Sequence, residues 1–293
     1  MNRLAVPIGL LTASSVSFPH VIHFLGWLCV IGVIYGALVA WVQQDIKKLV
    51  AYSSVSHLGF CVLGMIALNL QGLEGSVLYM INHGLSTGAM FLVVGMIHDR
   101  YHTRYKNLLS GLAKRMPILA FFFIFFTLAS IGLPGLNGFV SEFLTILGAF
   151  TSPYHGVGFG SEAALGIILG AVYLLHMAAR VIFGPLKTPE VHGEHGEHSA
   201  NPPGDIGGRE IAILIPLAIL VVYLGVYPSA VLRSMEDPLS KMQPTTQTES
   251  VQSAPTPVGA ATVSLTPGRT PTLALPLSTW GGEKRIDSIA MKP

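Results

Sequence analysis

The chain has 293 residues, of which 51% are hydrophobic and 11% are charged, and its mean hydropathy is +0.59. Since soluble domains contain about 25% charged residues, this composition excludes an ordinary soluble protein and predicts a membrane protein. The formal net charge of +2 indicates no particular partner, and we expect none among nucleic acids.

The N-terminal residues resemble a secretory signal peptide only in part. Arg3 precedes a short apolar stretch and the small residues at 13–15, but Pro7 interrupts that stretch. Residues 1–23 are therefore expected to precede the transmembrane domain rather than to act as a signal peptide.

Six apolar segments follow, each long enough to cross the roughly 30 Å hydrocarbon core as a helix. The connections between them are short, which forces neighbouring segments to be antiparallel. We predict an all-α polytopic membrane protein with a transmembrane domain at 24–232. Its six spans are Phe24–Val42, Leu49–Leu68, Gly75–His98, Pro117–Phe150, Ala163–Phe183 and Ile211–Val231.

The fourth span is too long for one straight helix, because about 34 helical residues would extend roughly 51 Å. Pro134-Gly135, followed by Gly138, predicts a break, since proline removes a backbone donor and glycine relaxes the chain. Transport proteins place ion sites beside such breaks. Glu142, the one ionisable residue of this span, is therefore a functional candidate.

Basic residues are confined to alternate loops, which predicts the orientation in the membrane. The loops after the second and fourth spans, residues 69–74 and 151–162, contain no Lys or Arg. The other three loops contain Lys47, Lys48, Arg100, Arg104, Lys106, Lys114, Arg115, Lys187 and Arg209. These basic loops are expected on the cytoplasmic side and both termini on the periplasmic side.

Two segments have a composition that does not predict a packed core. The loop at 184–209 is rich in Pro, Gly and His. Within it, His192, His195 and His198 could bind a stray transition metal, but we expect a solvated loop. Residues 233–293 are rich in Pro, Thr, Ser and Gln and are predicted to form a disordered tail.

The stretch LPGLNGFVSEF at 133–143 closely resembles the broken helix of the proton-pumping, antiporter-like membrane subunits of respiratory complex I, the NADH-quinone oxidoreductase. Among them the chain is most similar to the chain M and mitochondrial subunit 4 family. The same superfamily includes the large subunits of multisubunit sodium/proton antiporters. The resemblance covers about residues 1–232 and matches the second inverted repeat of the antiporter-like fold.

Ionisable residues within the spans are few, and a charge at the bilayer centre costs roughly 2.5–3.5 kcal/mol on insertion scales, so each is a functional candidate. His57 and His83 can exchange protons near neutral pH, and a buried carboxyl such as that of Glu142 can do so too. The alternative is a structural role, in which the histidines bond to neighbouring groups and the glutamate caps the broken helix. The resemblance implies a proton relay through both histidines, with Glu142 as the terminal acidic residue.

His176 and Arg180 lie one turn apart on the fifth span. Arg180 matches a basic residue near the end of the family helix and is expected to reach the cytoplasmic interface. His176 matches no family position and is an auxiliary relay candidate. Cys29 and Cys61 form no CxxC pair and are expected to pack as small apolar residues. We expect the chain to bind no metal and no cofactor.

The resemblance implies the C-terminal half of a longer subunit, with residues 1–23 as the remnant of a preceding helix and a periplasmic loop. The lysine and glutamate of the family's first repeat, and the lysine between the repeats, have no counterparts. Another polypeptide would then supply the first half, or the reading frame is truncated, or the product is inactive.

The function implied is that of a partial membrane subunit of a proton-pumping NADH:quinone oxidoreductase in the bacterial inner membrane. Its partners would be lipid and the neighbouring antiporter-like subunits, with NADH, FMN, iron–sulfur clusters and quinone bound by other subunits. The alternatives are a subunit of a multisubunit cation/proton antiporter and an inactive truncated scaffold.

Overall fold

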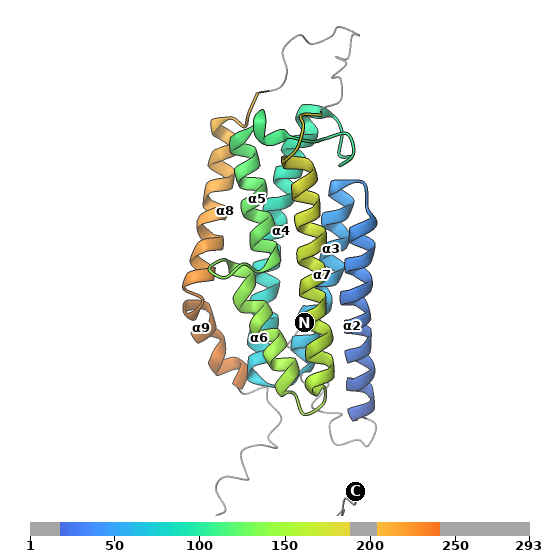
Figure 1. Ribbon diagram of the computed structural model, residues 1–293. Coiled ribbons are helices and arrows are strands. Elements are labelled where there is room, and N and C mark those ends of the chain that lie inside the picture. Colours follow the sequence, from blue (N-terminus) through green and yellow to red (C-terminus); the bar gives the residue numbers. More distant parts are fainter. Residues whose placement is uncertain (1–17, 188–203, 241–293) are drawn as a thin grey trace, which may run out of the picture. The chain divides into compact units, whose positions relative to one another are not determined.

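The computed structural model describes residues 18–187 and 204–240, which all belong to one compact unit. This part of the chain is a bundle of helices that run side by side (Figure 1). Five of its helices are long and apolar enough to cross a membrane: α2 (Phe18–Val42), α3 (Ile46–Ile66), α4 (Leu70–Tyr101), α7 (Gly156–Ile182) and α8 (Gly208–Val226). The predicted all-α fold is confirmed.

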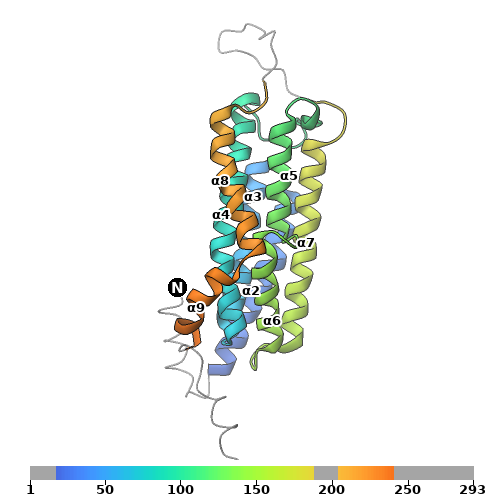
Figure 2. The ribbon, with the colours of Figure 1, turned by 90° about the vertical axis from the view of Figure 1, so that its left-hand side faces the viewer.

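The predicted break of the fourth span is present. It separates α5 (Pro117–Ile131) from α6 (Asn137–Thr151), which continue in the same direction beside α8 (Figure 2). Gly132 and Gly135 both have positive φ, +80° and +93°, a conformation that glycine adopts at little cost. Pro134 lies between them, as predicted for the break. Gly138 lies inside α6, where a Cβ would collide with the carbonyl oxygen of Ala129 at the end of α5.

Side-chain caps define the starts of α3 and α4. The carboxylate of Asp45 accepts hydrogen bonds from the amides of Lys47 and Lys48, at 2.8 and 3.2 Å. Asn69 caps α4 and also donates to the carbonyl oxygen of Gly148, at 2.7 Å. This second bond ties the start of α4 to the end of α6.

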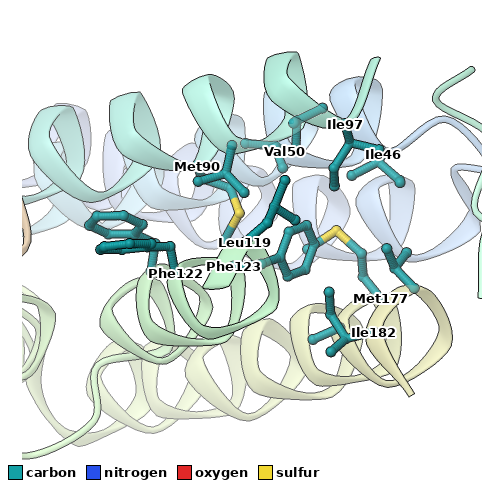
Figure 3. Packing of buried hydrophobic residues seen from close by; sticks show 14 of the residues in the cluster. Ile46, Val50, Met90, Ile97, Leu119, Phe122, Phe123, Met177 and Ile182 are labelled. Atoms are coloured by element: carbon teal, nitrogen blue, oxygen red, sulfur yellow. The ribbon is translucent and has the colours of Figure 1, made fainter. Parts of the chain in front are cut away.

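Buried apolar residues form two clusters, and polar residues lie between them. In the larger cluster, Phe123 of α5 packs among Leu119, Met90 and Met177 (Figure 3). Along α3, residues 46–50 contribute to this cluster and residues 60–66 to the smaller one. The buried side chains between these two stretches are Ser53, Ser56 and His57. The bundle therefore has a polar middle layer.

The basic loops lie at one end of the bundle. Residues 43–45, 102–116 and 183–187 are all at that end (Figure 1). They are joined by two short antiparallel bridges, Asp45 with Tyr105 and Ser110 with Lys187. The alternation of basic and non-basic loops thus corresponds to the two ends of the molecule.

Several predicted boundaries need correction. The first span begins at Phe18 rather than Phe24, and the fifth begins at Gly156 rather than Ala163. The sixth ends at Val226, and a further helix, α9 (Ser229–Ser240), follows it.

The predicted disordered tail is therefore wrong for residues 233–240. Met235 and Leu239 recur four residues apart on α9 and pack against the smaller apolar cluster, so this short helix has a face to bury. The predictions for residues 1–17, for 241–293 and for the histidines at 192–198 lie outside the described residues.

Candidate functional site

The break between α5 and α6 is covered by α8. A Cβ at Gly225 of α8 would collide with the backbone of Gly135 and Leu136. Non-helical backbone inside a membrane persists only where protein covers it or where it lines a water-filled cavity. The close approach of α8 at this glycine provides the cover.

Glu142 is joined to His57 through a tyrosine hydroxyl. The Tyr79 hydroxyl donates to Oε1 of Glu142 at 3.1 Å and lies 2.6 Å from Nδ1 of His57. The three residues come from α6, α4 and α3, and each is at most 7% exposed. They form one buried hydrogen-bonded chain across three helices.

His83 lies next to these three residues, but no hydrogen bond among the described contacts joins it to any of them. Its ring centroid is 4.8 Å from that of His57, and its Nδ1 is 3.1 Å from the hydroxyl of Thr87. The residue is only half-buried.

A cavity of about 10 Å³ adjoins both histidines, near the lower limit of the space that one water needs, about 10–15 Å³. It is lined by His57, Tyr79, Asn82, His83, Ser86, Ala129, Ser130, Gly138, Ser141 and Glu142.

A reciprocal pair of asparagines fixes α6 against α4. Asn82 donates to the carbonyl oxygen of Asn137 at 2.6 Å, and Asn137 donates to that of Asn82 at 3.1 Å. Asn82 also donates to the Ser141 hydroxyl at 3.1 Å. These bonds hold the first turn of α6, and hence Glu142 one turn further on, at a fixed height beside Tyr79.

The carboxyl group of Glu142 lies against the end of α5. A Cβ at Gly132 would collide with Oε2 of Glu142. The glycine therefore serves two purposes, since it permits the positive φ of the break and leaves room for the carboxyl group.

This arrangement can move a proton. A hydroxyl can donate one hydrogen bond and accept another at the same time. In the tautomer of His57 with its proton on Nδ1, the imidazole donates to the Tyr79 oxygen while the phenol donates to Glu142. Once Nε2 of His57 has taken up a second proton, the Nδ1 proton can pass to the Tyr79 oxygen while the phenol proton passes to the carboxylate. The imidazole and the phenol are then both neutral again.

The structure brings together three of the residues expected from the sequence, His57, His83 and Glu142. It adds Tyr79, which sequence reasoning missed, and Asn82, which was noticed only as a neighbour of His83 and not proposed for the site. Tyr79 precedes His83 by four residues, so the spacing of one helical turn was a signal that both lie on one face of α4. Asn82 gave a weaker signal as an amide within an apolar span.

His176 and Arg180 are not part of this cluster. Both are exposed on α7, and neither lines the cavity beside His57. Arg180 donates to Oδ1 of Asn107 at 3.0 Å, at the end of the bundle with the basic loops. The interfacial place of Arg180 and the auxiliary relay role of His176 stay predictions, and no hydrogen bond given for the described residues joins His176 to the cluster around His57.

A family model described as "NADH:quinone oxidoreductase/Mrp antiporter, TM" matches residues 4–166. The chain is 43% identical over 212 residues to a protein named NADH-ubiquinone oxidoreductase chain 4 from Chondrus crispus, covering 72% of this chain and 41% of that protein. It is 44% identical over 208 residues to NADH-quinone oxidoreductase subunit M from Rhodobacter capsulatus, covering 71% of this chain and 38% of that protein. The chain thus spans about two-fifths of the length of these relatives.

Solved structures of membrane complexes have the same fold. A chain of respiratory complex I from Thermus thermophilus with bound NADH matches with a TM-score of 0.65 at 29% identity, over 76% of this chain and 45% of that chain. A chain of the Mrp complex from Dietzia sp. DQ12-45-1b matches with a TM-score of 0.62 at 22% identity, over 75% of this chain and 49% of that chain. The second likeness concerns the fold alone.

Proposed function

Because the chain belongs to the NADH:quinone oxidoreductase/Mrp antiporter transmembrane family, we propose that it supplies a proton-translocating half-channel to the membrane part of an NADH:quinone oxidoreductase. In this proposal the chain carries no redox centre. NADH, FMN, iron–sulfur clusters and quinone are bound by other subunits of the complex. The chain lies in the bacterial inner membrane with its basic loops on the cytoplasmic side.

The observation that carries the proposal is the buried series of hydrogen bonds from His57 through Tyr79 to Glu142. Burying an imidazole, a phenol and a carboxyl together inside a membrane is costly, and such residues mark proton pathways. A purely structural cap on α6 would need only the carboxyl group. The continuous hydrogen bonding between three exchangeable groups favours proton transfer.

The proposed path enters at His83 and leaves at Glu142. His83 is half-buried and adjoins the cavity, where one water could connect it to His57, which lines the same cavity. Glu142 lies on α6, which leads to the end of the bundle away from the basic loops (Figure 1). The route therefore crosses the polar middle layer of the bundle toward the periplasmic side.

The proton reaches His83 from a partner that packs on α4. A Cβ placed at Gly84, Gly88 or Gly95 would meet no other atom of the described residues. This open strip of small residues permits a close helix approach directly beside His83. We assign it to the segment that holds the family's first repeat and its lysines, carried by another polypeptide or by a longer form of this subunit.

A multisubunit cation/proton antiporter is the second candidate. Its support is the family description, which includes Mrp antiporters, and the likeness in fold to the Mrp complex. The two relatives reported above, at 43% and 44% identity, are both named as NADH oxidoreductase subunits, which favours the first candidate.

The test is Glu142→Gln in the assembled complex. Glutamine has nearly the same shape and can still accept a hydrogen bond from Tyr79, but it cannot take up a proton. We expect NADH-driven proton uptake into membrane vesicles to fall about tenfold or more at matched abundance of the complex, because acid–base groups contribute large rate factors. Normal uptake with Glu142→Gln would leave Glu142 as a structural residue. Sodium-dependent proton exchange without any response to NADH would favour the antiporter.

A further inference from the structure

A second polar cavity lies at the end of the bundle that carries the basic loops. Its volume is about 530 Å³, and it is separate from the cavity beside His57. Its polar lining consists of Lys106, Asn107, Ser110, Arg180 and Lys187. Three positive side chains thus surround one space.

These three cations have no acidic partner among the described residues. The salt bridges in this part of the chain, Arg100 with Glu210 and Arg104 with Asp45, use other residues. Lys106 is almost fully buried, and the only hydrogen bond of its ammonium group to another described residue is to the carbonyl oxygen of Trp41, at 3.4 Å. Burial and the positive charge of Arg180 lower the pKa of Lys106. An anion in the cavity would relieve this repulsion.

Hydrogen bonds hold the backbone and side chains that form the walls of the cavity. The shape of the cavity is therefore fixed by these bonds and not only by the conformations of flexible side chains. Ser110 and Lys187 exchange two backbone hydrogen bonds, at 2.9 and 3.0 Å. The Ser110 hydroxyl donates to the carbonyl oxygen of Phe183 at 3.1 Å. Arg180 is oriented by its bond to Asn107, which itself donates to Gln44 at 2.8 Å. A site with a fixed frame can favour one ligand geometry.

The surroundings of the cavity have the composition of a membrane interface. Exposed aromatic and apolar side chains gather there, as is typical of the boundary between lipid and water. They are Trp41, Tyr105, Leu108, Phe183 and Leu186. On α7 an exposed apolar stripe of Leu165, Ile168, Val172 and Leu175 runs from this end toward the other.

We propose that this cavity binds the phosphate headgroup of an anionic phospholipid, whose acyl chains lie along the exposed stripe of α7. Lysine and arginine side chains are the groups that proteins use for phosphate oxygens. A soluble phosphate would use only the cations, whereas a phospholipid uses both the cations and the apolar surface beside them. This site is independent of the proposed proton path.

The test is lipid binding to the full chain, purified with the subunits that accompany it, measured by native mass spectrometry. The probes are phosphatidylglycerol, phosphatidylcholine and inorganic phosphate. The double variant Arg180→Gln/Lys187→Gln removes two of the three charges. Its matched control, Lys47→Gln/Lys48→Gln, removes two exposed charges at the same end that do not line the cavity. The single variant Lys187→Gln serves if the double variant does not assemble.

We expect phosphatidylglycerol to bind the unaltered protein and the control equally. Its affinity should fall about 25-fold in the double variant and about fivefold in the single variant, because each interfacial Lys or Arg contributes on the order of a fivefold factor. Phosphatidylcholine should bind weakly, and excess inorganic phosphate should not displace the lipid.

Four results would overturn the proposal. Unchanged phosphatidylglycerol binding in the variants, or equal binding of phosphatidylcholine, would remove the cavity as a site for anionic lipid. Displacement by inorganic phosphate would assign it to a soluble anion. Loss of a copurifying subunit from the double variant, with lipid binding unaltered, would assign it to an acidic protein surface.

Discussion

The Tyr79 hydroxyl lies 2.6 Å from Nδ1 of His57, although the two residues are 22 positions apart and on different helices. The same hydroxyl donates to Glu142 at 3.1 Å. One oxygen atom is thus the whole described connection between the imidazole and the carboxyl group.

The first prediction is that Tyr79→Phe lowers NADH-driven proton pumping about tenfold or more while the complex still assembles. Phenylalanine keeps the ring, which packs beside Phe60, and removes only the bridging oxygen. Pumping in membrane vesicles at matched abundance is the measurement. Tyr101→Phe is the control, since Tyr101 is also a buried tyrosine of α4 and its hydroxyl has no hydrogen-bond partner in the described structure. Equal effects of the two substitutions would argue against the bridge.

The second prediction is that Tyr79→Phe and Glu142→Gln are not additive. If both residues carry the same proton, the loss of one already stops transfer, and the second change adds little. The double variant should pump about as well as the worse single variant. If instead the two losses multiply, the residues act on separate steps.

Much of the fold could be predicted from the sequence, because membrane spans depend on composition and length. Hydropathy located the spans to within a few residues in most cases, and the family assignment from the 133–143 stretch is confirmed. The break at Pro134-Gly135 was predictable because proline and glycine act locally on the backbone. Some boundaries were predicted wrongly. The fifth span, for example, was predicted to begin at Ala163 but begins at Gly156, because its start depends on the packing of polar or small residues, which hydropathy does not detect.

The candidate site was predicted only in part, since the sequence identifies titratable groups but not the contacts between helices. His57, His83 and Glu142 were recognisable as rare ionisable residues inside apolar spans. Tyr79 was not recognisable, because a tyrosine within an apolar span is usually interpreted as an apolar packing residue. The contact of Tyr79 with Glu142 depends on how α4 is placed along α6. This placement is set by the bonds of Asn69 to Gly148 and of Asn82 to Asn137, which join residues far apart in sequence.

The third prediction concerns orientation. In a chain without Cys29 and Cys61, a single cysteine at Val157 should react with an impermeant thiol reagent in intact cells, and one at Tyr105 should react only after the membrane is opened. The two positions are exposed, at 70% and 54%, at opposite ends of the bundle. The basic loops near Tyr105 are expected in the cytoplasm. The reverse pattern of labelling would invert the topology.

The fourth prediction separates α9 from the residues after it. A chain that ends at residue 240 should assemble normally, because the composition of 241–293 predicts no packed core. A chain that ends at residue 228 should be less stable, since it lacks the contacts of Met235 and Leu239. Burial of one leucine contributes about 2 kcal/mol, so Leu239→Ala should reproduce part of the loss. Thermal stability of the solubilised protein is the measurement, with exposed Arg233→Ala as the control, and equal stability of both truncations would contradict the role of α9.

The fifth prediction compares two glycines of the helix break. Gly132 and Gly135 both have positive φ, so alanine at either position strains the backbone by on the order of 1–2 kcal/mol. Only at Gly132 would the new Cβ collide with Oε2 of Glu142, whereas a Cβ at Gly135 would meet no other described residue within 4 Å apart from its chain neighbours. Gly132→Ala must therefore push the carboxyl group away from the Tyr79 hydroxyl, and proton transfer falls steeply once hydrogen-bond reach is lost. We expect both variants to lose similar stability and only Gly132→Ala to lose pumping, by about tenfold or more, in vesicles with equal amounts of complex. If Gly135→Ala impairs pumping as strongly, then backbone strain at the break is what lowers activity. In that case displacement of the Glu142 carboxyl group does not explain the effect of Gly132→Ala.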